Sequence, residues 1–307
     1  MITKEGVVFE KGPEGSVSIL RVPAKINLWL EVIGKRENGY HDISSLMLPI
    51  SVFDRLTVAV RPGDGGIAIT CDTPEIPADE RNLAWRAADL YVKASGKKAG
   101  VDIGIEKRIP WGAGLGGGSS DAAGVLVALN SFFENAIPSG ELETVALTLG
   151  ADVPFFLASR PALATGVGEK LELAKSSPDY PLLLIKPPVF VATGWVYQSL
   201  KLTKQGAQIK LAGFEEKPYD FELLVDNDLE SVTVPRYPVI AAIKQWLIGR
   251  GALTASMSGS GPTVFGIFPT DQAAAEAAQI ARKEWSDCWV HAARVMGRKN
   301  RSRRRAR

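Results

Sequence analysis

A glycine-rich run constrains this chain more than any other segment. Residues 110–121 read PWGAGLGGGSSD and contain five glycines. The run lies between an alternating apolar segment, 101–108, and a segment with helical spacing, 120–132. Without side chains, successive N–H groups can converge on an anion, and a following helix adds the positive end of its dipole. Ser119 and Ser120 add hydroxyls for phosphate oxygens or for a metal ion. We therefore predict a phosphate-binding loop.

The residues within and before the glycine run exclude some types of phosphate-binding loop. A Walker A loop ends in Gly-Lys-Ser/Thr, and this run holds no lysine. Gly112, Gly114 and Gly117 satisfy the G-x-G-x-x-G pattern of dinucleotide-binding folds. The segment before the loop, however, ends in Glu-Lys-Arg at 106–108, which is too polar for the buried first strand of such a fold. A nicotinamide-dependent enzyme is therefore a minor alternative.

Composition and charge set the broad class. The chain has 307 residues with 46% hydrophobic and 23% charged residues, which fits a globular protein of about two domains. The two cysteines, Cys71 and Cys288, lie far apart and there are only two histidines, so the sequence shows neither the pattern of a disulfide framework nor the spacing of a Cys/His zinc cluster, and we predict a reducing compartment. Seven of the 36 basic residues lie in 298–307, and the rest of the chain is net negative. This distribution argues against a nucleic-acid-binding domain, although the tail could still contact RNA or a membrane surface.

Targeting and membrane segments are not apparent in the sequence. The first ten residues, MITKEGVVFE, lack the apolar core of a signal peptide. Apolar stretches such as 181–185 and 187–192 are far shorter than the ~20 residues that span a bilayer. We predict a cytoplasmic protein without a membrane partner.

The order of predicted elements favours an α+β fold, because strands and helices do not alternate regularly. Strand composition marks 17–22, 26–33, 55–61, 101–108, 182–185 and 263–268. Helical spacing marks 81–95, 120–132, 139–149, 239–250 and 271–285, with Ser139 as an expected N-cap and Gly96 and Gly150 just beyond two helix ends. A polar stretch at 174–180 suggests a boundary. We expect domains at 1–173 and 181–297, followed by a disordered basic tail at 298–307.

Three segments resemble the motifs of the GHMP kinases, which are small-molecule kinases without a Walker loop. Residues 23–28 (PAKINL) resemble the first motif, 110–123 the central ATP-binding motif, and 258–263 (SGSGPT) the third. The longer segments 23–47 and 150–157 are most similar to GHMP kinases that phosphorylate a cytidylylated methylerythritol on the non-mevalonate route to isoprenoids. The resemblance implies two α+β domains with ATP and substrate in the cleft between them.

The resemblance also implies catalytic and substrate-binding residues. Asp152 would accept the proton of the substrate 2-hydroxyl, and Lys25 would pair with it and offset charge on the transferred phosphoryl group. Asn27 would lie beside the substrate, Tyr40 would stack on cytosine and His41 would bind the base edge. Taken without the resemblance, Asp152 could equally be a helix N-cap, Lys25 an edge-strand charge and Asn27 a turn residue.

For ATP, the resemblance implies Asn82 and the loop, with Mg²⁺ accompanying the nucleotide and its protein ligands unassigned. The implied loop residues are Pro110, Trp111, Gly112, Ala113, Gly114, Leu115, Gly116, Gly117, Gly118, Ser119 and Ser120. Two further alternatives remain open at this point. The chain could be a GHMP kinase of the homoserine or mevalonate type, or a binding protein with a degenerate ATP site and an RNA-binding tail. The oligomeric state is unassigned.

Overall fold

The computed structural model describes residues 8–11, 17–63, 65–201 and 211–297, and the chain divides into two compact units. Unit 1 comprises Met1–Ala24, Val52–Trp111 and Gly116–Ser159, and unit 2 comprises Lys25–Ser51, Gly112–Leu115 and Arg160–Arg307. Two long strands, β2 (Val17–Lys35) and β3 (His41–Pro62), supply residues to both units. The predicted basic tail lies outside the described residues.

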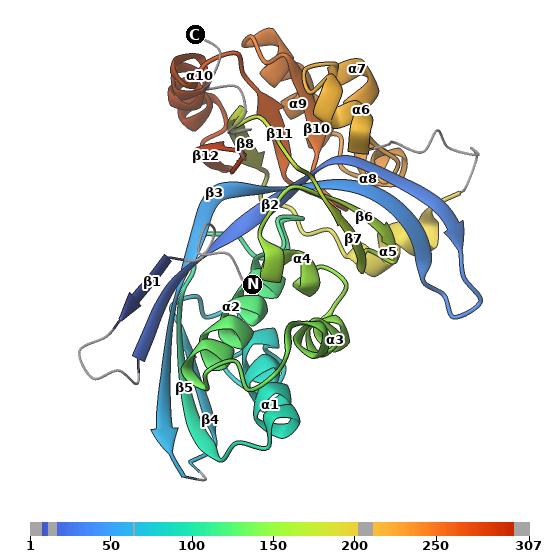
Figure 1. Ribbon diagram of the computed structural model, residues 1–307. Coiled ribbons are helices and arrows are strands. Elements are labelled where there is room, and N and C mark those ends of the chain that lie inside the picture. The colour runs from blue at the N-terminus through green and yellow to red at the C-terminus, as the bar shows by residue number, and fades with distance from the viewer. Residues whose placement is uncertain (1–7, 12–16, 64, 202–210, 298–307) are drawn as a thin grey trace, which may run out of the picture. The chain divides into compact units, whose positions relative to one another are not determined.

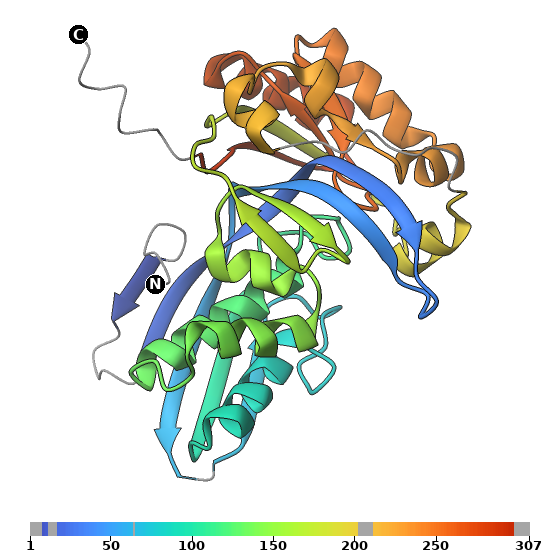
Figure 2. The same ribbon diagram turned by 45° about the vertical axis from the view of Figure 1, so that its right-hand side comes forward.

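Unit 1 combines strands in the order β1-β2-β3-β5-β4 with four helices. Its other strands are β1 (Val8–Lys11), β4 (Ile67–Cys71) and β5 (Ala99–Glu106). Its helices are α1 (Leu83–Ser95), α2 (Gly117–Phe132), α3 (Ser139–Leu149) and α4 (Val153–Ala158). β5 pairs antiparallel with β3 and parallel with β4. Helices α1, α2 and α3 lie on one face of these strands (Figure 1 and Figure 2).

The close packing of α2 explains its composition. Every residue from Ser120 to Asn130 is buried, and most of them are small or aliphatic. A Cβ atom at Gly124 would lie 2.6 Å from side-chain atoms of both Leu56 and Val22. The helix axis therefore approaches β2 and β3 more closely than an alanine would allow at this position, so the middle of the helix packs directly on the strands.

Unit 2 contains further strand pairs and a second sheet. β3 pairs antiparallel with β6 (Ala162–Gly166), β6 with β7 (Lys170–Leu173), and β2 runs parallel to β9 (Asp226–Asn227). The second sheet has the order β10 (Thr254–Met257), β11 (Val264–Ile267), β8 (Pro181–Lys186) and β12 (Trp289–Arg294), all antiparallel. The helices are α5 (Thr193–Ser199), α6 (Leu211–Glu216), α7 (Phe221–Leu224), α8 (Glu230–Arg236), α9 (Val239–Gly249) and α10 (Asp271–Glu284). Apolar residues of α9, α10, β8 and β11 form one core.

Most of the predicted elements are confirmed, and so is the α+β class. The predicted strands 17–22 and 26–33 are one continuous strand, β2. The N-cap assigned to Ser139 is wrong: Pro138 occupies that position and Ser139 is the first residue of α3. Within the described residues no helix is long and apolar enough to cross a membrane. The division into domains at 174–180 and the cytoplasmic location stay predictions.

Candidate active site

The three motif segments meet within unit 2. Gly114 of the glycine loop has φ +75°, and a Cβ atom there would overlap the carbonyl oxygen of Ser258. The hydroxyl of Ser258 donates to the carbonyl of Gly114 over 2.9 Å. The backbone N–H of Lys25 donates to the carbonyl of Leu115 over 3.0 Å. The first motif, the part of the glycine loop in unit 2 and the third motif therefore contact one another directly.

Lys25 is held by a chain of buried hydrogen bonds. Its Nζ donates to Oδ1 of Asn27 over 2.6 Å, and Nδ2 of Asn27 donates to Oγ of Ser45 over 2.7 Å. The hydroxyl of Ser45 in turn donates to the carbonyl of Trp29 over 2.7 Å. The backbone N–H of Asn27 donates to Oγ of Ser258 over 3.3 Å. Lys25 is 5% exposed and Asn27 is 3% exposed, so this ammonium group is desolvated and oriented rather than a solvated charge at a strand edge.

The rest of the glycine loop begins helix α2 in unit 1. Gly116 is the N-cap residue in the left-handed conformation, with φ 72°, and the helix starts at Gly117. The first turn thus presents the unpaired N–H groups that suit an anion. Ser120 is buried, and its hydroxyl donates to the carbonyl of Pro23 over 2.6 Å. Its backbone N–H donates to Gly116. Both donors of Ser120 thus stabilise the helix start, and its predicted contact with ATP stays a prediction.

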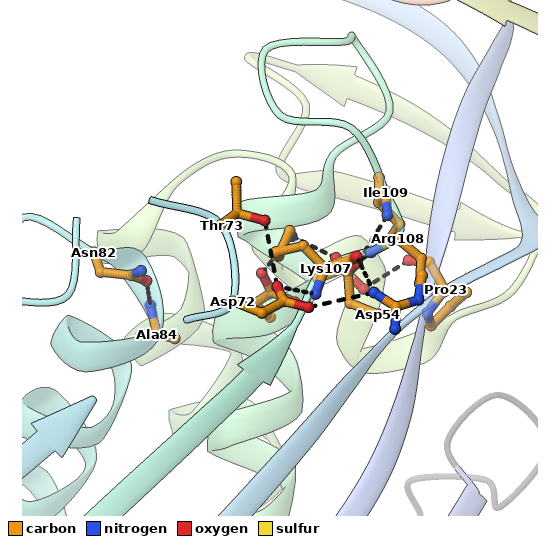
Figure 3. Close-up of polar contacts among 11 residues, drawn as sticks. Pro23, Asp54, Asp72, Thr73, Asn82, Ala84, Lys107, Arg108 and Ile109 are labelled. Carbon is orange, nitrogen blue, oxygen red and sulfur yellow. Dashed lines mark hydrogen bonds and ion pairs between the residues drawn. The ribbon is translucent and has the colours of Figure 1, made fainter. Parts of the chain in front are cut away.

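A buried ion cluster lies beneath the same helix start. The Nζ of Lys107 forms an ion pair with Asp54 (Figure 3). It forms a second ion pair, over 2.8 Å, with Asp121 of α2. Asp54 also accepts the backbone N–H groups of Arg108 over 2.6 Å and Ile109 over 2.8 Å. A Cβ atom at Gly117 would lie 3.2 Å from Nζ of Lys107. The cluster therefore joins β3, the end of β5 and the first turns of α2.

The two carboxylates of this cluster differ in their hydrogen bonds. Asp54 accepts three donors, whereas Oδ1 of Asp121 is buried without a hydrogen-bond partner. Burial raises the pKa of Asp121 to about 7, against the opposing attraction of Lys107. Asp121 therefore binds or releases a proton near neutral pH.

Asp152 and Asn82 occupy helix starts in unit 1. Asp152 is at the N-cap position of α4, yet its side chain makes no capping hydrogen bond, so the simple capping role is not supported. Asn82 does cap: its Oδ1 accepts the N–H of Ala84 over 2.9 Å (Figure 3). Its Nδ2 donates to the carbonyl of Pro77 over 2.8 Å. The side chain of Asn82 thus stabilises the start of α1, and its predicted contact with ATP stays a prediction.

The two predicted base-binding residues differ in exposure. Tyr40 is 63% exposed in the turn between β2 and β3, whereas His41 is 8% exposed. The ring of His41 lies 5.2 Å from the ring of Tyr197, centroid to centroid, and the planes are tilted by 33°. Burial lowers the pKa of His41, and the nearby charge of Lys35 lowers it further. His41 is thus a neutral imidazole near pH 7, with one donor and one acceptor nitrogen.

Comparisons with known proteins decide the family. Residues 82–160 match the model of the GHMP kinase N-terminal domain and residues 216–287 that of the GHMP kinase C-terminal domain. A 4-diphosphocytidyl-2-C-methyl-D-erythritol kinase of Geobacter sulfurreducens is 45% identical over 267 residues, or 87% of this chain and 95% of that protein. The chain belongs to the 4-diphosphocytidyl-2-C-methyl-D-erythritol kinase family. Another kinase of this name, from Synechococcus, is 42% identical and covers 87% of this chain and 91% of its own.

Solved structures agree with this family. A 4-(cytidine 5'-diphospho)-2C-methyl-D-erythritol kinase is 37% identical with a TM-score of 0.78, covering 90% of this chain and 99% of that one. A homoserine kinase from Cytophaga hutchinsonii has a TM-score of 0.74 at 18% identity, over 94% of this chain and 97% of its own, and supports the fold alone. The predicted GHMP kinase fold is confirmed.

Several residues that contact the candidate site residues of this chain could not be recognised from the sequence. Lys107 was visible only as part of a polar strand end, and its carboxylate partners are 53 and 14 positions away. Tyr197 carried no signal beyond its aromatic character. Asn227 binds the carbonyl of Gly259 in the third motif and that of Met257 just before it, and it lies in a two-residue strand too short to predict.

Proposed function

We propose that the chain transfers the γ-phosphoryl group of ATP to the 2-hydroxyl of 4-diphosphocytidyl-2-C-methyl-D-erythritol. The names of the relatives support the substrate, and the meeting of the three motif segments at Lys25 supports the chemistry. The substrate oxygen attacks the γ-phosphorus, the bond to the β,γ-bridging oxygen breaks and ADP leaves. The hydroxyl proton passes to the carboxylate of Asp152, which is the proposed base.

The buried ammonium of Lys25 would offset negative charge during the transfer. Phosphoryl transfer passes through a loose transition state whose charge is spread over the phosphoryl oxygens, so catalysis depends on positioned cations. The hydrogen bond from Lys25 to Asn27, itself fixed by Ser45 and Ser258, supports a fixed position for this cation. The motif resemblance supports Lys25 as the charge partner of Asp152, and we propose that role for it.

ATP would bind with its phosphates at the start of α2, where the left-handed Gly116 exposes the first N–H groups of the helix. Among the described residues no group of three or more His, Cys, Asp or Glu side chains could hold a metal ion by itself. We propose that Mg²⁺ arrives with ATP, since Mg²⁺ is commonly bound by one or two carboxylates together with substrate phosphates. When bound, the ion would neutralise phosphate charge.

The cytosine would be recognised by His41 and aromatic faces. A neutral imidazole can donate to an acceptor of the base edge and accept from its exocyclic amine. The ring of Tyr197, 5.2 Å from the ring of His41 between centroids, would help to orient His41. The exposed ring of Tyr40 would supply a stacking face.

The test is ADP release, measured in a coupled assay with ATP, Mg²⁺ and four alcohols: the cytidylylated methylerythritol, homoserine, mevalonate and galactose. We expect turnover with the first alcohol alone. Turnover with another alcohol instead would contradict the substrate, and no turnover with any of them would contradict the kinase activity.

The base is tested with Asp152→Asn, which should lower kcat by roughly 10²–10⁴-fold and leave the KM for ATP nearly unchanged. Asp220→Asn is the matched control, because Asp220 also occupies an N-cap position without a capping hydrogen bond. The control should retain wild-type kcat. A wild-type kcat in Asp152→Asn would refute the assignment of the base.

A further inference from the structure

The side-chain amide of Asn227 binds the backbone where the third motif begins. Its Nδ2 donates to the carbonyl of Met257 over 2.7 Å and to the carbonyl of Gly259 over 2.8 Å. Its Oδ1 accepts the N–H of Leu229 over 3.0 Å. The side chain is 4% exposed, so both amide donors are committed to two buried carbonyls.

Glu230 binds the same segment through a hydrogen-bond acceptor, its carboxylate, whereas Asn227 uses donors. Its carboxylate accepts the backbone N–H of Met257 over 2.8 Å and the hydroxyl of Ser256 over 3.0 Å, and it forms an ion pair with Lys244. Asn227 thus binds carbonyls and Glu230 binds donors of one short segment. We call Asn227 and Glu230 the polar clamp.

The clamped segment lies beside the side chain of Lys25. Gly259 has φ +56°, and a Cβ atom there would lie 3.6 Å from Nζ of Lys25 and 3.4 Å from Oδ1 of Asn27. The preceding residue, Ser258, binds both the N–H of Asn27 and the carbonyl of Gly114. A displacement of this turn would therefore move Lys25 and the glycine loop together.

We propose that Asn227 is a positioning residue for phosphoryl transfer, because it fixes the 257–259 backbone against which the Lys25–Asn27 pair is set. This inference rests on the proposed function for its kinetic part. An asparagine is required because the position needs two donors and one acceptor. A carboxylate of the same size would place an oxygen against two carbonyl oxygens at hydrogen-bond distance, which is repulsive.

The experiment compares Asn227→Asp with Asn130→Asp. Asn130 is a matched control: it is 3% exposed, its Nδ2 donates to the carbonyl of Ile137 over 3.1 Å, and its Oδ1 accepts the N–H of the same residue. It lies in unit 1 and outside all three motifs. Both variants should lose stability, so kcat is expressed per folded molecule from a denaturation curve.

We expect Asn227→Asp to lower kcat by about 10²-fold at pH 8, the size of effect that a misplacement near 1 Å can cause, with a much smaller change in KM. Lowering the pH protonates the new carboxylate and restores a donor, so the ratio of wild-type to variant kcat should shrink. Asn130→Asp should keep wild-type kcat per folded molecule. Equal kcat losses in both variants, or a ratio independent of pH, would overturn the proposal.

A measurement without turnover separates this inference from the proposed function. Hydrogen exchange of the 257–263 amides reports the turn directly, since Gly261 N–H donates to Ser258 and Ser258 N–H to Thr263. Asn227→Asp should speed exchange there, whereas Asn130→Asp should not. Unchanged exchange would overturn the positioning role even in an active enzyme, and inactive wild-type protein with faster exchange in Asn227→Asp would count against the proposed function alone.

Discussion

Replacing Asp121 by asparagine should change how the stability of the protein depends on pH. The carboxylate shares Lys107 with Asp54, which has two further backbone donors, and its own Oδ1 is buried without a hydrogen-bond partner. Burial therefore raises the pKa of Asp121 to about 7 from an ordinary value of 3.8. The asparagine variant keeps the size of the side chain but cannot bind the proton.

The sign follows from proton counting. Between pH 4 and pH 7 the folded wild type holds one proton at Asp121 that the unfolded chain has lost, so raising the pH favours unfolding. The slope is about −1.4 kcal/mol of unfolding free energy per pH unit, and it levels off above the folded pKa. From pH 5 to pH 8 the wild type should lose roughly 2.5 kcal/mol relative to Asp121→Asn.

The measurement is urea denaturation of both proteins at pH 5, 6, 7 and 8 and constant ionic strength. The difference between their unfolding free energies removes the contributions of all other titrating groups. Asp102→Asn is the control: Asp102 pairs with Arg61 at 45% side-chain exposure, so its removal should give a small difference without this slope. A wild-type-minus-variant difference that is constant with pH, or that grows with pH, would refute the assignment of the proton to Asp121.

Two further predictions concern the site itself. Gly114→Ala should abolish most activity, because the added Cβ would overlap the carbonyl oxygen of Ser258, whereas Gly140→Ala meets no atom within 4 Å and should be harmless; kcat/KM and Tm of both variants check this. Tyr197→Leu removes the ring against His41 and should raise the KM for the cytidylylated alcohol, while an unchanged KM for ATP serves as the internal reference. A parallel rise in both KM values would contradict a role at the base.

Local sequence signals were enough to predict the helices whose spacing and caps lie within one short stretch of sequence. The helix predicted at 81–95 is α1, which Asn82 caps and Gly96 ends in the left-handed conformation. The helix predicted at 271–285 is α10, capped by Thr270. In both cases spacing, cap and end lie within one short window, so no distant contact is needed to define them.

Elements that depend on distant partners could not be predicted. β9 has two residues and exists as a strand because it pairs with Trp29 and Leu30 of β2, about two hundred positions earlier in the chain. The start of α2 was placed at Ser120, three residues late, because glycines have low helix propensity. The helix nevertheless starts at Gly117, where the Lys107 cluster lies against its first residue and close packing at Gly124 excludes a side chain.

In the candidate site, too, a local motif points to individual residues, whereas their environment depends on residues far away in the sequence. The motif resemblance predicts roles for Lys25 and Asn27, but composition alone could not distinguish a buried, oriented ammonium from a charge at a strand edge. What distinguishes them is the hydrogen bond to Asn27 and the turn at Gly259, which lies 232 positions beyond Asn27. A buried charge is stable only where such partners compensate its lost hydration. Because those partners come from separate segments, the fold must assemble before the lysine acquires this buried, hydrogen-bonded environment.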